Sequence, residues 1–205
     1  MSARRTLVAG IGNVFLGDDG FGVEVVRRLG AGAPLPGGDR VEIRDIGVRG
    51  VHLAYQLLDG YGTVVLVDTL SRGLAPGTVS LVAPDAGPLE TGGPPPLDGH
   101  RMGPDTVLAL LATLSAGTGA SAPERILVVG CEPASLAEGI GLSEPVAAAV
   151  DPAAALVREV LATGEPAPEP SWGAGRPRAA AAGAGLPRAA SDRAGAGLPA
   201  PGDQA

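Results

Sequence analysis

The chain has 205 residues and a formal net charge of −7, and all of its basic side chains are arginines. Because phosphate binding requires a basic surface, this acidic balance argues against nucleic acid as a main partner. Hydrophobic residues make up 45% of the chain but aromatic residues only 2%, so valine, leucine, isoleucine and alanine must form the core.

Alternating apolar runs and turn residues predict strands that alternate with helices. Strands are expected at 6–9, 41–44, 63–67, 78–82 and 125–130, and helices at 21–29, 51–58, 105–114 and 143–161. This alternation is typical of an α/β fold with three layers, in which right-handed crossovers place helices on both faces of a mostly parallel sheet.

Three details refine this prediction. The link at 71–77 is too short for a crossover helix, so the strand at 78–82 is expected at the sheet edge, antiparallel to its neighbour. Ser143 is expected to cap the last helix, because its side chain can accept a hydrogen bond from a free backbone amide. Pro152 is expected to kink or split that helix.

The composition changes at Glu165. Residues 165–205 are rich in proline, alanine, glycine and arginine, and the string Gly-Ala-Gly-Leu-Pro occurs at both 183–187 and 195–199. Such a segment cannot bury enough apolar surface to offset the entropy lost on ordering. The sequence therefore predicts a folded domain at 4–164 and a disordered C-terminal tail at 165–205.

The single cysteine, Cys131, excludes an internal disulfide framework and fits a reducing compartment. The first apolar run ends at Ala9 and is too short for a signal peptide or a membrane span. We therefore expect a cytoplasmic protein without a membrane partner. The ordinary apolar composition favours a monomer, and Cys131 itself is expected to be a small buried residue.

A glycine-rich stretch at 10–22 joins the first strand to the first helix and contains two adjacent carboxylates, Asp18 and Asp19. Gly10 and Gly12 begin like a dinucleotide-binding motif, but the third glycine is out of register, and the carboxylates would repel a pyrophosphate. The chain also has no lysine for a phosphate-binding loop. A nucleotide-binding module is therefore the weaker alternative.

Groups that can bind a metal are expected at the carboxyl ends of the strands, where parallel α/β sheets place their functional residues. Asp18 and Asp19 follow the first strand, Asp68 ends the third, and His100 lies in the loop before the third helix. Two carboxylates and one imidazole suit a divalent metal with open coordination positions. The alternatives are structural: an aspartate that caps the first helix, a loop aspartate and a solvated histidine. His52 is expected to have a structural or surface role.

Several further motifs follow in a fixed order along the chain. They are Gly10-Ile11-Gly12-Asn13, Asp18-Asp19-Gly20, Gly22, Asp45, Val65-Leu66-Val67-Asp68, Ala75-Pro76-Gly77-Thr78, His100, Gly130-Cys131-Glu132-Pro133, Leu136, Gly141-Leu142-Ser143 and Val146. This combination resembles that of the nickel–iron hydrogenase maturation endopeptidases. The resemblance covers about residues 5–162 and implies a five-stranded twisted sheet between helices.

The resemblance also implies a function. Carried over by position, the metal ligands are Asp19, Asp68 and His100, with Asp45 near the site but outside the ligand set, and Asp18 in an orienting or capping role. Members of this family remove a short C-terminal extension from the hydrogenase large-subunit precursor after nickel has entered it. The ligands then bind nickel carried by the substrate, and no permanent cofactor is expected. A non-catalytic nickel-binding chaperone on the same fold is the alternative.

Overall fold

The computed structural model describes residues 5–84, 103–163 and 169–172. The chain divides into two units, residues 1–175 and 176–205, and every described residue belongs to the first. In these described ranges, no helix has the length and apolar character needed to cross a membrane.

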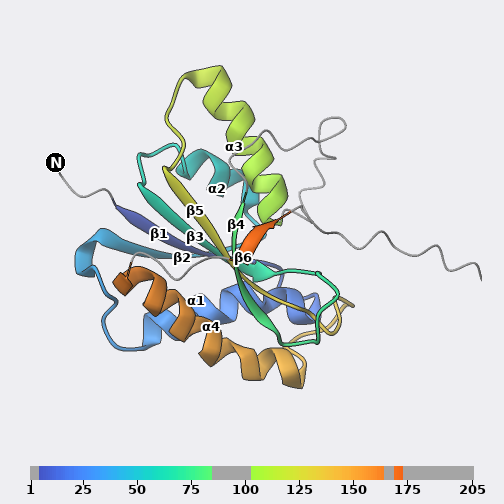
Figure 1. The fold of residues 1–205 in the computed structure, drawn as a ribbon. Helices are drawn as coiled ribbons and strands as arrows, with labels where there is room; N and C mark the ends of the chain where they lie inside the picture. Colours follow the sequence, from blue (N-terminus) through green and yellow to red (C-terminus); the bar gives the residue numbers. More distant parts are fainter. Residues whose placement is uncertain (1–4, 85–102, 164–168, 173–205) are drawn as a thin grey trace, which may run out of the picture. The chain divides into compact units, whose positions relative to one another are not determined.

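One mixed sheet forms the centre of the first unit (Figure 1). Its strands are β1 (Thr6–Ile11), β2 (Val41–Gly47), β3 (Thr63–Thr69), β4 (Val79–Pro84), β5 (Arg125–Cys131) and β6 (Glu169–Trp172). Their order across the sheet is β2-β1-β3-β5-β4-β6. Neighbouring strands are parallel except for β4 and β5, which pair antiparallel. The predicted mostly parallel sheet is therefore confirmed, including the reversed direction of β4.

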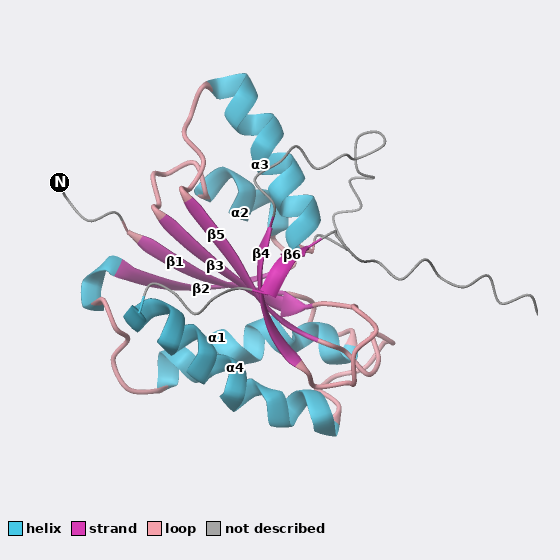
Figure 2. Ribbon diagram, viewed as in Figure 1, coloured by secondary structure: helices cyan, strands magenta, loops and turns pink. Residues whose placement is uncertain are grey.

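Helices cover both faces of the sheet, as Figures 1 and 2 show. The α-helices are α1 (Phe21–Ala31), α2 (Gly50–Gln56), α3 (Pro104–Thr118) and α4 (Glu144–Thr163), and two short 3-10 turns are η1 (Gly17–Gly20) and η2 (Gly38–Arg40). One apolar cluster joins α1 and α4 to one face of the sheet, and a second joins α2 and α3 to the other. This is the predicted three-layer arrangement.

Alternation along the central strands divides their side chains between these two clusters. Val65 and Val67 of β3 pack in the cluster with α1 and α4, whereas Val64 and Leu66 pack in the cluster with α2 and α3. Successive side chains of a strand point to opposite faces, so a strand covered on both faces must be apolar throughout. The apolar run of β3 is unbroken because helices cover the sheet on both of its faces.

The structure differs from the sequence prediction in three places. The strand β6 lies beyond residue 164, the expected end of the folded domain, and it covers the side of β4 that was expected to be the sheet edge. A four-residue segment containing Pro170 gives little strand signal, but proline is tolerated in an edge strand. Pro152 lies inside a continuous α4 rather than splitting it.

A register shift interrupts the pairing of β1 with β2. Gly10 pairs with Asp45, but the next residue, Ile11, pairs with Gly47, so Ile46 is an extra residue on β2. Such a bulge bends its strand and changes the direction in which the following residues leave the sheet. The segment after β2 is thereby directed over the carboxyl end of β1, where Gly12 N donates a hydrogen bond to Gly47 O at 3.1 Å.

Candidate active site

A cleft with a volume of about 380 Å³ lies at the carboxyl ends of β1 and β3. The chain passes from β1 to β2 on one side and returns to β3 on the other, so the strand order reverses between β1 and β3. Ligand sites of open α/β sheets occur at such a reversal. The cleft is lined by Ile11, Gly12, Leu16, Asp19, Gly47, Val48, Asp68, Thr69, Gly103, Asp105 and Leu136.

Asp19 reaches the cleft from η1, directly after the glycine-rich turn. Its Oδ2 accepts a hydrogen bond from Asn13 N at 2.7 Å, and its Oδ1 accepts one from Thr69 Oγ1 at 3.5 Å. The residue in the N-cap position of α1 is Gly20, and the two hydrogen bonds of Asp19 come from Asn13 and Thr69 rather than from the first turn of that helix. The interpretation of Asp19 as a cap of the first helix is therefore wrong.

Asp68 is the buried carboxylate of the cleft, with 4% of its surface exposed. Its Oδ1 accepts a hydrogen bond from Thr69 N at 2.7 Å. Burial raises the pKa of Asp68 well above its ordinary value, and the nearby negative charge of Asp19 raises it further. A cation in the cleft would oppose both effects, because it favours the ionised carboxylate.

Two glycines lie beside the carboxylate of Asp68. A Cβ atom on Gly12 would lie 3.6 Å from Asp68 Oδ1, and one on Gly103 would lie 3.9 Å from Asp68 Oδ2. Gly12 has a second constraint, because its φ is +124° and its Cβ would lie 1.7 Å from Asp19 O. Glycine at this position therefore lets Asp19 and Asp68 share one cleft.

The other glycines of the first motif serve packing between strand and helix. A Cβ on Gly10 would lie 2.2 Å from Gly22 O, and one on Gly22 would lie 2.1 Å from Val67 O. Within the described lining of the cleft, all the charged residues are aspartates. A phosphate would meet repulsion from these carboxylates, which argues against the nucleotide-binding alternative.

Asp105 lines the cleft, although the sequence analysis identified it only as the first residue of a helix. It lies in the first turn of α3, and its charge contributes to the raised pKa of Asp68. Its Oδ1 accepts a hydrogen bond from Thr106 N at 2.9 Å. The sequence feature that could have pointed to Asp105 is its position, as an acidic residue in the first helical turn after the loop that contains His100.

The third expected metal ligand, His100, lies outside the described residues. Among the residues that are described, no group of three or more His, Cys, Asp or Glu side chains has an arrangement that could hold a metal ion. The structure thus brings Asp19 and Asp68 to one cleft, and the position of His100 stays a prediction.

Asp18 has a different role from its neighbour. It is only 1% exposed, and its carboxylate accepts hydrogen bonds from Ala134 N, Ser135 N, Ser143 N and Ser143 Oγ at 2.6–2.9 Å. Burial opposes ionisation, but the hydrogen bonds outweigh it and lower the pKa of Asp18 below its ordinary value. Asp18 therefore attaches the 134–143 segment to η1. Ser143, expected to be a helix cap, donates its hydroxyl to Asp18 instead.

The positions of Cys131 and His52 agree with the structural or surface roles expected from the sequence. Cys131 is fully buried, and burial together with the charges of Asp18 and Glu132 raises the pKa of its thiol to about 11. A thiol of this kind is a poor nucleophile, because the thiolate is the reactive form. His52 is exposed on α2.

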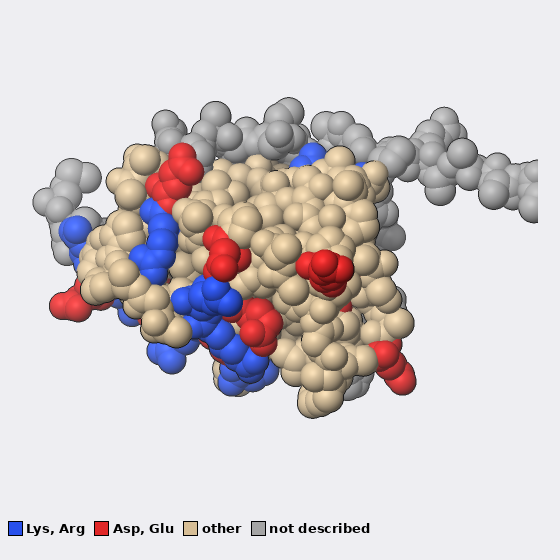
Figure 3. All heavy atoms as spheres, turned by 90° about the horizontal axis from the view of Figure 1, so that it is seen from below, with Lys and Arg blue, Asp and Glu red and all other residues tan. Residues whose placement is uncertain are grey.

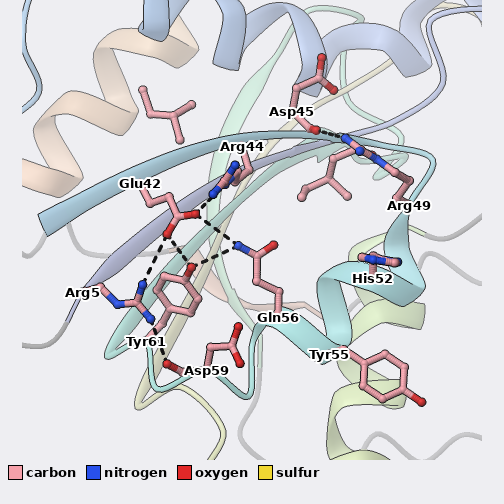
Figure 4. Close-up of a pocket in the computed structure, with 12 residues that line it drawn as sticks. Arg5, Glu42, Arg44, Asp45, Arg49, His52, Tyr55, Gln56, Asp59 and Tyr61 are labelled. Carbon is pink, nitrogen blue, oxygen red and sulfur yellow. Dashed lines mark hydrogen bonds and ion pairs between the residues drawn. The ribbon is translucent and has the colours of Figure 1, made fainter. Parts of the chain in front are cut away.

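A second hollow, of about 870 Å³, lies between β2 and α2 (Figure 4). Its side chains bind one another: Tyr61 OH donates to Glu42 Oε2 at 2.6 Å, and Arg44 Nε donates to Glu42 Oε1 at 2.5 Å. The hydrogen bond from Tyr61 helps to hold the pKa of Glu42 below its ordinary value. Asp45 also lines this hollow, where it forms an ion pair with Arg27 at 3.5 Å. These mutual contacts favour the smaller cleft as the active site.

Comparisons with known proteins identify the family of this chain. The sequence model of the hydrogenase maturation protease family matches residues 23–160. The chain is 37% identical over 162 residues to the hydrogenase expression/formation protein HupM of Azotobacter chroococcum, covering 78% of this chain and 73% of that protein. It is 34% identical over 159 residues to the hydrogenase 2 maturation protease of Escherichia coli, covering 77% of this chain and 89% of the relative.

A solved structure shows the same fold. The hydrogenase maturating endopeptidase HybD from E. coli superposes with a TM-score of 0.61 and 31% identity, over 77% of this chain and 91% of that one. The family match spans more than half of the chain, and the relatives have endopeptidase names, so the activity class is a peptidase that acts in hydrogenase maturation. By sequence and by fold, this chain belongs to the hydrogenase maturation protease family.

Proposed function

We propose that this protein removes the C-terminal extension from the large-subunit precursor of a nickel–iron hydrogenase, and that it recognises nickel carried by that precursor. The observation that carries the proposal is the convergence of Asp19 and Asp68, from separate parts of the chain, on one cleft at the strand-order reversal. Asp19, Asp68 and His100 are the proposed ligands of the substrate's nickel. Two carboxylates and an imidazole leave coordination positions open for substrate or water.

The charge of the cleft supports a cationic substrate group. Asp19, Asp68 and Asp105 line it together, and the raised pKa of Asp68 reflects the cost of holding its negative charge there. Nickel bound to the precursor would lower that cost, whereas an acidic peptide would increase it. The bound metal would polarise the scissile carbonyl or activate a water molecule, and so supply the chemistry that the buried Cys131 does not.

A processing assay tests this proposal. Nickel-loaded and metal-free precursors would be incubated with the wild-type protein, and loss of the extension would be followed by gel shift and mass spectrometry. We expect cleavage of the nickel-loaded precursor alone, and no cleavage by Asp19→Ala. The matched control is Asp39→Ala, which removes an exposed carboxylate from η2, outside the cleft.

Two results would contradict the proposal. Cleavage by Asp19→Ala at the wild-type rate would exclude Asp19 from the chemistry. Stable binding of the nickel-loaded precursor without any loss of mass would instead support the non-catalytic nickel-binding chaperone.

A further inference from the structure

Large apolar side chains are exposed in, or directly beside, the segments that form the cleft. Val48 and Leu136 line the cleft and have 48% and 41% of their surface exposed. Phe15 and Ile140 are 64% and 84% exposed but do not line it. Phe15 is notable because aromatic residues make up only 2% of the chain. We call these four residues the apolar rim.

The backbone holds one side of the apolar rim in place. Leu16 and Gly139 form an isolated parallel bridge, in which Gly139 N donates to Phe15 O and Gly17 N donates to Gly139 O, both at 2.9 Å. Phe15 and Ile140 are therefore carried by two paired segments. Asp18 fixes the same segments by its hydrogen bonds from Ser135 and Ser143. Their exposure is imposed by a hydrogen-bonded framework.

Val48 lines the cleft from the segment after β2 and is held by a separate set of contacts. It directly follows Gly47, whose carbonyl accepts the hydrogen bond from Gly12 N, and Arg49 N donates to Ile46 O at 3.1 Å. The apolar rim thus combines residues from three chain segments around one cleft. A rigid group of exposed apolar side chains of this kind marks a protein interaction site.

The position of the rim indicates the size of its partner. A peptide in the cleft would contact Val48 and Leu136, but Phe15 and Ile140 lie outside the lining. A partner that covers all four side chains must therefore extend beyond the cleft. Figure 3 shows that most of the arginines visible on the face formed by α1 and α4 gather in one part of that face.

We infer that Phe15, Val48, Leu136 and Ile140 dock an apolar patch on the folded body of the large subunit, next to the point where its C-terminal extension leaves it. This inference rests on the proposed function and deepens it, because it separates recognition of the folded body from cleavage of the extension. The carboxylates inside the cleft also require that the docked patch has no acidic side chains at its centre.

The test uses the purified mature large subunit, which lacks the extension, as the binding probe. Phe15→Ala/Ile140→Ala is compared with Val51→Ala/Tyr55→Ala. The second pair removes exposed apolar side chains of similar size (43% and 57% exposed) from α2, outside the cleft lining. Binding is measured by calorimetry. A synthetic peptide with the sequence of the extension serves as the second probe.

We expect the mature subunit to bind the wild-type and α2-variant proteins equally, and the Phe15→Ala/Ile140→Ala protein about tenfold more weakly, as for a central apolar contact. Binding of the peptide is expected to be the same for all three proteins. The inference is overturned if the mature subunit does not bind the wild type, or if it binds the two double variants equally. Failure of the proposed function is distinguishable, because it appears as uncleaved precursor whatever the affinity for the mature subunit.

Discussion

Ser143 donates two hydrogen bonds to the Asp18 carboxylate, from its backbone N–H to Oδ1 at 2.6 Å and from its hydroxyl to Oδ2 at 2.9 Å. The two residues are 125 positions apart in the chain. Ser143 immediately precedes α4, so this contact attaches the beginning of the last helix to the turn that carries Asp19. The buried member of the aspartate pair therefore positions the member that lines the cleft.

Asp18→Asn should destabilise the protein. The substitution removes a buried negative charge that accepts four hydrogen bonds and places an amide group among their donors. Loss of hydrogen bonds to a charged group predicts a decrease of about 2–4 kcal/mol in the free energy of unfolding at pH 7. Urea denaturation measures it, and Asp39→Asn, at an exposed site, is the control expected to match the wild type.

The same comparison has a predictable pH dependence. The pKa of Asp18 is lowered in the folded protein, so its contribution to stability is present above the ordinary aspartate value of 3.8 and is lost as the pH falls through the lowered value. The stability difference between wild type and Asp18→Asn should therefore shrink on acidification. A difference that stays constant from neutral pH to strongly acidic pH would contradict this role.

Asp68→Asn should stabilise the metal-free protein while abolishing processing. The pKa of Asp68 is raised by burial and by Asp19, so the folded state loses stability as the pH rises from the ordinary aspartate value to the raised one. Removing the charge should increase the free energy of unfolding by about 1 kcal/mol or more, as for other strained active-site groups. Thermal melting at pH 7 without metal measures this change. A lower melting temperature for the variant would show that the charge of Asp68 does not destabilise the folded protein.

Asp105 and His100 should differ in their effect on processing. As a proposed ligand, His100 is expected to be as important as Asp19, so His100→Ala should abolish cleavage of the nickel-loaded precursor. Asp105→Asn keeps the shape of a side chain that contributes charge beside Asp68. The Asp105→Asn substitution should reduce kcat/KM by about tenfold, which is the lower end of the loss observed when a residue that supports a metal ligand is replaced. Equal losses for the two variants would indicate that Asp105 is itself a ligand.

Gly12→Ala should prevent formation of the cleft. Its Cβ would lie 1.7 Å from Asp19 O, and its φ of +124° is strained for any residue with a side chain. We expect a loss of about 4 kcal/mol or more in the free energy of unfolding, which is characteristic of strain at a special backbone conformation. The control is Gly30→Ala, in α1, where the added Cβ would meet no described atom within 4 Å apart from its chain neighbours and the backbone of its own helix. That change should stabilise the protein by about 0.5–1 kcal/mol. Circular dichroism during urea denaturation compares the two variants.

The fold was largely predictable because its signals are local. The apolar run of β3 and the helical spacing of α1 each identified an element without knowledge of its neighbours. The strand β6 was missed because its pairing with β4 depends on a partner distant in sequence. Pro152 was expected to split α4, but a helix can continue through a proline when tertiary packing supports it, and Ala149 and Ala153 are buried against the sheet.

The site was predictable only where position along a strand determined it. Asp68 directly follows the apolar run of β3, so its location near the carboxyl end of that strand could be inferred. The different roles of Asp18 and Asp19 could not be inferred, because adjacent residues in a 3-10 turn point in different directions. Asp105 was missed for a related reason, since an acidic residue in a first helical turn usually has only a capping or dipole role.

The bulge at Ile46 has a consequence for how the proposed docking surface can be altered. Asp19 and Asp68 depend on β1 and β3, whereas Val48 depends on the single extra residue that shifts the register of β2. Because β2 occupies the end of the sheet order, a change in the length of this segment can redirect Val48 without disturbing the central strands. By the docking inference, a chimaeric protein that exchanges this segment is expected to change its affinity for the partner while Asp19 and Asp68 keep their positions.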